Sequence, residues 1–158
     1  MKINRLLITM AGLVMTGQAF ASSNFQIAAP SNKIGEGRCY MDYCGYSKIV
    51  STKIVQKNAN AIKVKVSLLG GESHHKNGNY PKAGKPPKNI KWNKKPHQIT
   101  AICSHENPAL VMGNDVDDLD FSSIPGVMES SANLYFQICH NYYDGYYLGA
   151  VKFGYVTY

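Results

Sequence analysis

Four cysteines are the residues of this sequence whose chemistry is best defined. Cys39 and Cys44 are five positions apart, whereas Cys103 and Cys139 lie much further along the chain. An even number of cysteines in a small exported protein is typical of disulfides. Cys39 with Cys44 would close a local loop and leave Cys103 with Cys139. The alternative joins Cys39 and Cys44 each to a distant cysteine. A four-cysteine zinc site lacks its usual C-x2-C spacing.

A cysteine nucleophile would need a thiolate beside a histidine. Cys139–His140 and Cys103 with His105 have these residue types. Neighbouring residues on a helix point in different directions, however, and an oxidised cysteine offers no thiolate. We therefore predict no cysteine catalysis. We expect His140 to be solvated, or to cap the end of its helix.

Histidines are the strongest candidates for metal ligands. His74 and His75 are adjacent, and His97 and His105 follow. Neutral imidazoles bind Zn²⁺ or Cu²⁺, but no H-E-x-x-H pattern fixes their geometry. We interpret them as solvated loop residues and predict no metal site or cofactor.

An acidic segment carries Asp115, Asp117, Asp118 and Asp120, which is a composition suited to calcium. Leu119 stands at the third ligand position of an EF-hand loop, and Asp120 stands where that loop needs glycine. The spacing therefore favours a solvated acidic loop that faces the basic half of the chain.

Paired carboxylates would be required for glycosidase chemistry, and Glu106 and Glu129 qualify by residue type alone. The sequence contains no G-x-S-x-G, P-loop or dinucleotide fingerprint. We predict no catalytic residue, and a small hydrolase is the least favoured class of function.

A lysine-rich segment, Gly70–Pro96, is the clearest break in composition. It holds four Gly, four Pro and seven Lys, with no acid after Glu72. Loops of this length are usually functional or disordered, and we expect Ile90 and Trp92 to anchor this one. The predicted binding residues are Lys85, Lys88, Lys91, Trp92, Lys94 and Lys95.

The chain has a net charge of +7, and its charges are segregated. Residues 33–95 carry about +11 and residues 96–158 about −6, counted from the sequence. The two halves attract one another, and the excess of lysine also suits an acidic partner. A basic segment with aromatic residues resembles a nucleic-acid patch in composition. Because the chain is exported, we instead expect an acidic protein or an anionic cell-wall polymer, and no nucleic acid.

The first 21 residues have the composition of a bacterial signal peptide. Lys2 and Arg5 precede a short apolar core, Leu6–Val14, and Ala19-Phe20-Ala21 has small residues at the cleavage positions. Removal of this segment leaves residues 22–158, with a net charge of +5 and enough length for one domain. We predict a periplasmic or secreted protein without a membrane span.

Hydrophobic periodicity indicates the elements that position these residues. A helix is expected over Glu129–Tyr143, with Ser130 or Ser131 as its cap and one polar stripe, Ser130, Asn133, Gln137, His140 and Asp144. Alternation predicts a strand over Ala61–Leu69. Residue propensity favours a strand over Ser47–Gln56, which would complete a hairpin from Lys48 to Leu69, although the apolar spacing of Ser47–Gln56 also permits a helix. Further strands are expected over Ile99–Cys103, Ala109–Met112 and Tyr146–Tyr158, with a loop over Gly113–Ser123 and a loose arm over Ser22–Gly37.

These elements predict an α+β fold, with a small antiparallel sheet, one main C-terminal helix packed on it and two disulfides. Such a rigid domain with a long charged loop suits a non-enzymatic binding protein. We expect an inhibitor or immunity-type protein with a protein partner in the cell envelope. A protein that binds peptidoglycan or another glycan is the alternative, and the terminal tyrosines Tyr142, Tyr143, Tyr146, Tyr147 and Tyr155 could then stack on sugar rings.

Overall fold

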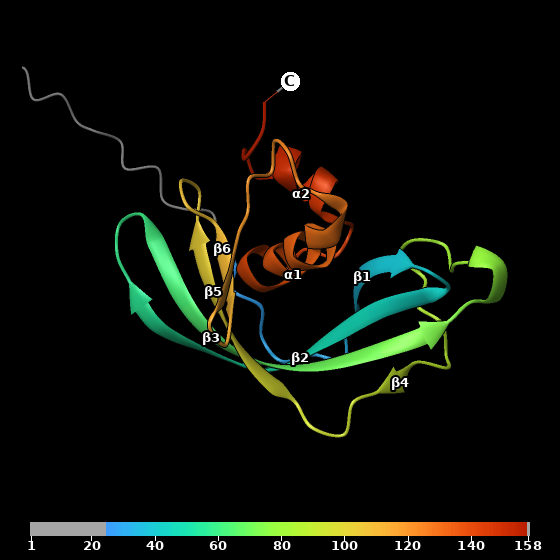
Figure 1. Cartoon of the computed structure of the whole chain (residues 1–158). Helices are drawn as coiled ribbons and strands as arrows, with labels where there is room; N and C mark the ends of the chain where they lie inside the picture. Colours follow the sequence, from blue (N-terminus) through green and yellow to red (C-terminus); the bar gives the residue numbers. More distant parts are fainter. Residues whose placement is uncertain (1–24, 158) are drawn as a thin grey trace, which may run out of the picture.

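The computed structural model describes residues 25–157, so the predicted signal peptide lies outside the described residues. The strands are β1 (Gly35–Tyr40), β2 (Tyr43–Lys57), β3 (Ala61–His74), β4 (Lys91–Trp92), β5 (His97–Ser104), β6 (Ala109–Met112) and β7 (Asp115–Asp118). The helices are α1 (Glu129–His140) and α2 (Tyr146–Lys152), with short 3-10 turns at Lys76–Gly78 and Gly126–Met128. All strand pairs are antiparallel, in the order β1-β2-β3-β5-β6-β7, and β4 also pairs with β3. The sheet curls around α1, with α2 on the same concave side (Figure 1). The α+β prediction is confirmed.

The β2–β3 hairpin, which was predicted from the sequence, forms the long axis of the sheet. It extends beyond its predicted bounds, Lys48 and Leu69. Ile62, Val64, Val66 and Leu68 are buried beneath α1, while Lys63 and Lys65 are exposed on the convex face. Between the strands, the Asn58 side chain accepts hydrogen bonds from the backbone of Asn60 and Ala61, which fixes the turn.

Helix α1 fills the concave face. Tyr135, Phe136, Ile138 and Cys139 are each fully buried. A disulfide joins Cys103 of β5 to Cys139, and a second joins Cys39 to Cys44 across β1 and β2. The first of the two pairings considered from the sequence is therefore the observed one, and β5, the third strand from the β7 end of the sheet, is covalently fixed to α1.

Two residues of the polar stripe, the buried Gln137 and the exposed Ser130, hold the edge strand β1. The Gln137 side chain donates to the Glu36 carbonyl at 3.2 Å and accepts from the Ser47 hydroxyl at 3.0 Å. Two turns earlier, the Ser130 hydroxyl accepts from the Arg38 amide at 2.9 Å. Since β1 pairs only with β2, these side chains supply partners to backbone groups at the end of the sheet.

The remaining residues of the stripe bind the chain that follows α1. Asn133 Oδ1 accepts from the Tyr146 amide at 2.7 Å, and His140 Nε2 lies 2.9 Å from the Tyr155 hydroxyl. His140 is 3% exposed, so the expectation of a solvated histidine is wrong. The expected serine caps are also wrong. Met128 occupies the N-cap position without a side-chain bond, and Ser131 donates to Asp117.

The predicted closing strand over Tyr146–Tyr158 is wrong, because Tyr146–Lys152 forms α2. Gly149 explains the difference. A Cβ on it would lie 2.8 Å from the Phe136 ring, so glycine allows α2 to approach α1 closely. Gly149 and Ala150 are buried in this contact. The glycine that suggested a bulged strand is a helix-packing residue.

Three segments that were predicted to be irregular contain strands, namely the lysine-rich segment, which includes the end of β3 and all of β4, and two others. Asp115–Asp118 of the expected acidic loop pairs with β6 as β7, and Gly35–Gly37 of the expected arm belongs to β1. The arm is also held in place, because the buried Ala28 donates its amide to the Ile138 carbonyl at 2.8 Å. Among residues 25–157, no helix is long and apolar enough to cross a membrane.

We expect the two disulfides to contribute unequally to stability, because stabilisation grows with the length of the loop that is closed. Their sequence separations are 36 and five residues. Replacing Cys103 and Cys139 by alanine should lower the free energy of unfolding by about 4 kcal/mol, against about 2 kcal/mol for Cys39 and Cys44. Urea denaturation of both double variants measures the difference. Equal losses would contradict the argument.

Candidate functional site

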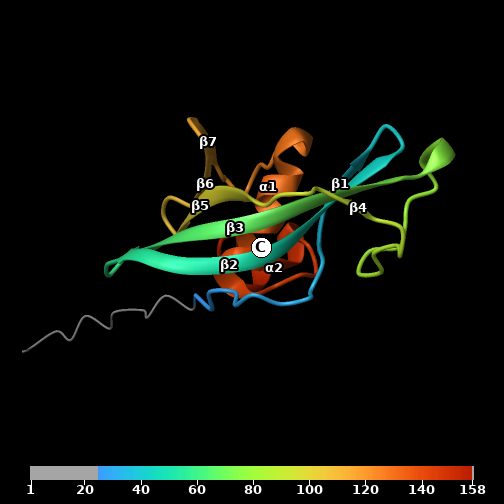
Figure 2. The same ribbon diagram turned by 90° about the horizontal axis from the view of Figure 1, so that it is seen from below.

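Lysines gather on the convex face of the sheet, which Figure 2 shows in front of the helices. Lys53 of β2 lies directly opposite Lys65 of β3, and Lys63 lies two residues further along the same face. All three are exposed. Like charges placed opposite one another across two strands destabilise a sheet. We call Lys53, Lys63 and Lys65 the basic face.

The lysine-rich segment is attached to the sheet at two points. Gly70–His74 belongs to β3, and Lys91–Trp92 forms β4, with Gly71 opposite Trp92. In Figure 1, β4 and the turn that follows it lie on the side of the sheet away from the helices. The five predicted lysines, Lys85, Lys88, Lys91, Lys94 and Lys95, are all exposed.

Trp92 is the anchor of this segment, and the chain's own residues engage its ring. A Cβ on Gly71 would lie 2.6 Å from a ring carbon of Trp92, so the indole packs directly on the strand. The Lys48 ammonium lies 4.6 Å from the ring centre, within the range of a cation–π contact. The lysines on either side of Trp92, by contrast, are exposed to solvent.

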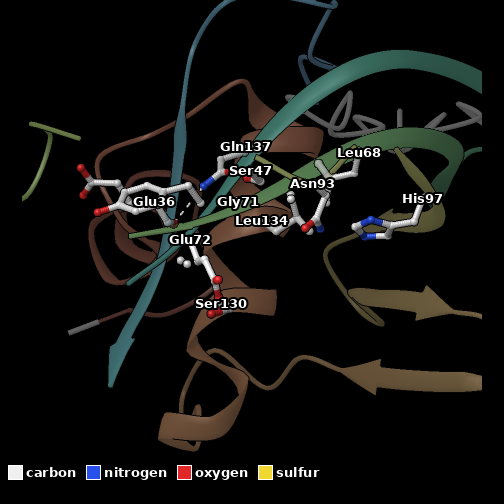
Figure 3. Close-up of a pocket in the computed structure, with 14 residues that line it drawn as sticks. Glu36, Ser47, Leu68, Gly71, Glu72, Asn93, His97, Ser130, Leu134 and Gln137 are labelled. Carbon is white, nitrogen blue, oxygen red and sulfur yellow. Dashed lines mark hydrogen bonds between the residues drawn. The ribbon is translucent and has the colours of Figure 1, made fainter. Parts of the chain in front are cut away.

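Two adjoining cavities lie at the other side of the sheet, where sequence reasoning placed no site. The first, about 290 Å³, lies between α1 and strands β1 to β3 (Figure 3). The second, about 540 Å³, lies between β1, residues 80–84 and the start of α2. Glu36 and Gly37 line both cavities, so together these form one hollow along β1, which we call the β1 groove.

The described lining of the β1 groove has acidic side chains and no lysine or arginine. Its carboxylates are Glu36, Glu72, Glu129 and Asp144. One Glu36 oxygen accepts from the Gly84 amide at 3.1 Å, which fixes that carboxylate at the junction of the two cavities. These residues are far apart in sequence, and no spacing could have revealed that they share a cavity.

Three of the terminal tyrosines, Tyr143, Tyr146 and Tyr147, line the second cavity together with Tyr80. Burial raises the pKa of the Tyr143 hydroxyl, although its hydrogen bond with Ser31 opposes the shift. Tyr155 lies elsewhere. Its hydroxyl is 2.8 Å from that of Tyr135, and burial raises the pKa of both groups. Tyr155 therefore packs against the hydrophobic core and does not line the β1 groove.

The other residues considered from sequence are dispersed. Glu106 lines a separate cavity of about 410 Å³ beside Asp118 and Asp120, whereas Glu129 lines the β1 groove. The two glutamates therefore do not border a common cavity.

The histidines are also separated. His75 bonds to Ser73, His97 lines the first cavity and His105 stacks on Tyr155. Burial lowers the pKa of His105. In the described part of the chain, no three His, Cys, Asp or Glu side chains are placed to hold a metal ion.

Comparison with known proteins gives no relative: no family model, curated protein or solved structure matches the chain.

We expect Trp92→Ala to release the lysine-rich segment from the sheet. The lost packing is about 1–2 kcal/mol for a half-buried aromatic ring, which should speed tryptic cleavage after Lys88, Lys91 and Lys94 by about tenfold. Limited proteolysis followed by mass spectrometry measures these rates. Tyr40→Ala removes an exposed ring elsewhere and should leave them unchanged. Unchanged cleavage of the Trp92 variant would show that the ring is not an anchor.

Proposed function

We propose that this chain is a non-enzymatic binding protein of the periplasm or the extracellular space. Its basic face and the lysine-rich segment bind an acidic protein partner, in the manner of an inhibitor or immunity protein. The observation that carries the proposal is the register that sets Lys53 directly opposite Lys65, with both exposed. This arrangement costs stability in the free protein, and an acidic partner would neutralise it.

The rest of the structure suits this role. Two disulfides brace the chain, one between β1 and β2 and one between β5 and α1, and such bonds persist in oxidising compartments. A braced scaffold loses little conformational freedom when it binds, which favours affinity. The lysines of Lys88–Lys95 flank a strand that is fixed to β3, so part of this segment is preorganised as well.

The partner can be sought with the disulfide-bonded protein immobilised in envelope extract at about 0.15 M salt, followed by mass spectrometry. One protein captured in near-stoichiometric amount supports the proposal. Its association rate should then fall about tenfold or more when Lys53, Lys63 and Lys65 are changed to Gln, because steering by the basic face is lost. Changing Lys33, Arg38 and Lys152 to Gln removes the same charge outside the basic face and the lysine-rich segment, and it should have a smaller effect.

Two outcomes would contradict the proposal. The first is equal loss of rate in both triple variants, which would show that only net charge matters. The second is sedimentation of the protein with purified peptidoglycan in the absence of any protein partner, which would favour the glycan-binding alternative.

The charge repulsion itself makes a prediction about the free protein. Lys65→Gln should raise the free energy of unfolding by about 0.2–0.5 kcal/mol at low salt, a value reduced for exposure, and high salt should abolish the gain. Urea denaturation at two salt concentrations measures it. Lys76→Gln lies outside the hairpin and should give no gain. A loss of stability in Lys65→Gln would refute the idea that the facing lysines repel.

A further inference from the structure

The β1 groove contains a glycine that the packing of the chain does not require. Gly45 is the third residue of β2, paired with Glu72, and it lines the first cavity. Apart from its chain neighbours, a Cβ on it would meet one atom within 4 Å, the Arg38 carbonyl oxygen at 3.9 Å. By contrast, Gly35 is required, because a Cβ there would clash with the Gln137 side chain.

Glycine in a strand interior reduces stability and often marks a place where a ligand approaches the backbone. The backbone of Gly45 is not in the left-handed region that favours glycine. Its missing side chain therefore leaves a hollow that other atoms of the protein do not fill. Ser47 and Gly70 pair on the same face of the sheet, and these small residues extend the hollow toward Leu68.

The walls indicate the kind of ligand. Glu36 and Glu72 border the first cavity, and Glu36, Glu129 and Asp144 border the second. The described lining has no lysine or arginine to neutralise them, and His97 is its one histidine. Four tyrosines, Tyr80, Tyr143, Tyr146 and Tyr147, complete the second cavity. Carboxylates and aromatic faces both favour a positive charge.

Tyr143 already shows this preference. The Lys33 ammonium of the chain itself lies 5.0 Å from the centre of its ring. A ring that lines the groove thus makes a cation–π contact in the folded protein, with a lysine that is not itself part of the described lining.

We infer that the β1 groove is a binding site for a small ligand that carries a primary ammonium group. The ammonium lies against Glu36, at the junction of the two cavities, and the body of the ligand lies over Gly45 or against the tyrosines. A polyamine and an amino sugar share this chemistry. Residues 80–84 of the lysine-rich segment border the second cavity, but Lys53, Lys63 and Lys65 of the basic face lie outside the groove. Substitutions in the basic face therefore test the protein partner without altering the groove, and either proposal can fail without the other.

Calorimetric titration of the disulfide-bonded protein at low salt tests the inference with spermidine, glucosamine and N-acetylglucosamine. Saturable binding of either amine, without binding of the acetylated sugar, supports it. Spermidine alone identifies a polyamine site, and glucosamine alone an amino-sugar site. Binding of none of the three, or equal binding of both sugars, overturns it.

Two substitutions locate the site. Glu36→Gln should weaken amine binding by about tenfold, because it removes the charge and keeps an acceptor for Gly84. The matched change Glu106→Gln lies at another cavity and should leave affinity unchanged. An equal effect of the two substitutions would reduce the binding to nonspecific charge attraction and overturn the inference.

Gly45→Val should fill the hollow. Because the space is open and valine favours strands, the midpoint of urea unfolding should stay the same or rise, while affinity for the amine falls at least about fivefold. Gly45→Ala serves if the valine variant does not fold. Retained affinity in a stable Gly45 variant would show that the ligand does not approach this strand.

Discussion

The contact between Gln137 and the edge strand β1 is the interaction on which the concave side of this protein depends. One buried amide joins three segments, because it donates to the backbone of Glu36 and accepts from Ser47 of β2. Without it, the polar groups of β1 nearest the helix would be buried without a partner, at a cost larger than the gain from a typical hydrogen bond. The same contact fixes Glu36 and Gly37, which line both cavities of the β1 groove. The helix that closes the core therefore also forms the groove.

This dependence explains which parts of the fold could be predicted from the sequence. The alternation of Ile62, Val64 and Val66 reports burial directly, and the cysteine count with the local spacing of Cys39 and Cys44 favoured the observed pairing. Local pattern was sufficient for the strand, whereas the cysteine spacing favoured one pairing and left a second one open. The polar stripe of α1 was correctly recognised as a stripe, but its environment was not, because a polar residue can face water or a strand edge. His140, which was expected to be solvated or to cap the helix, is buried against Tyr155.

The prediction of a strand in the C-terminal segment failed for a related reason. Tyrosine and valine favour strands, yet Gly149 and Ala150 provide a small surface that fits against Phe136. Tertiary packing overrides such local preference. The candidate sites divide in the same way. Exposed lysines are visible as composition, so the lysine-rich segment could be found from the sequence. The β1 groove combines β1, β3 and α1 with residues 80–84 and α2, and only the folded chain brings Glu36, Glu72 and Asp144 to one hollow.

The net charge of +7 conceals two surfaces of opposite character. The strand alternation of β3 sends Lys63 and Lys65 to one face and leaves the other face for the core, while the end of the same strand contributes Glu72 to the groove. A single layer of β-sheet thus separates the lysines of the basic face from the acidic side chains of the β1 groove. Attraction across the sheet stabilises neither surface strongly, since exposed charges are screened within about 8 Å at physiological salt. Each surface is therefore left with charge that its own protein does not neutralise. A fold that bound an acidic protein on the convex face would keep the groove open for a small cation at the same time.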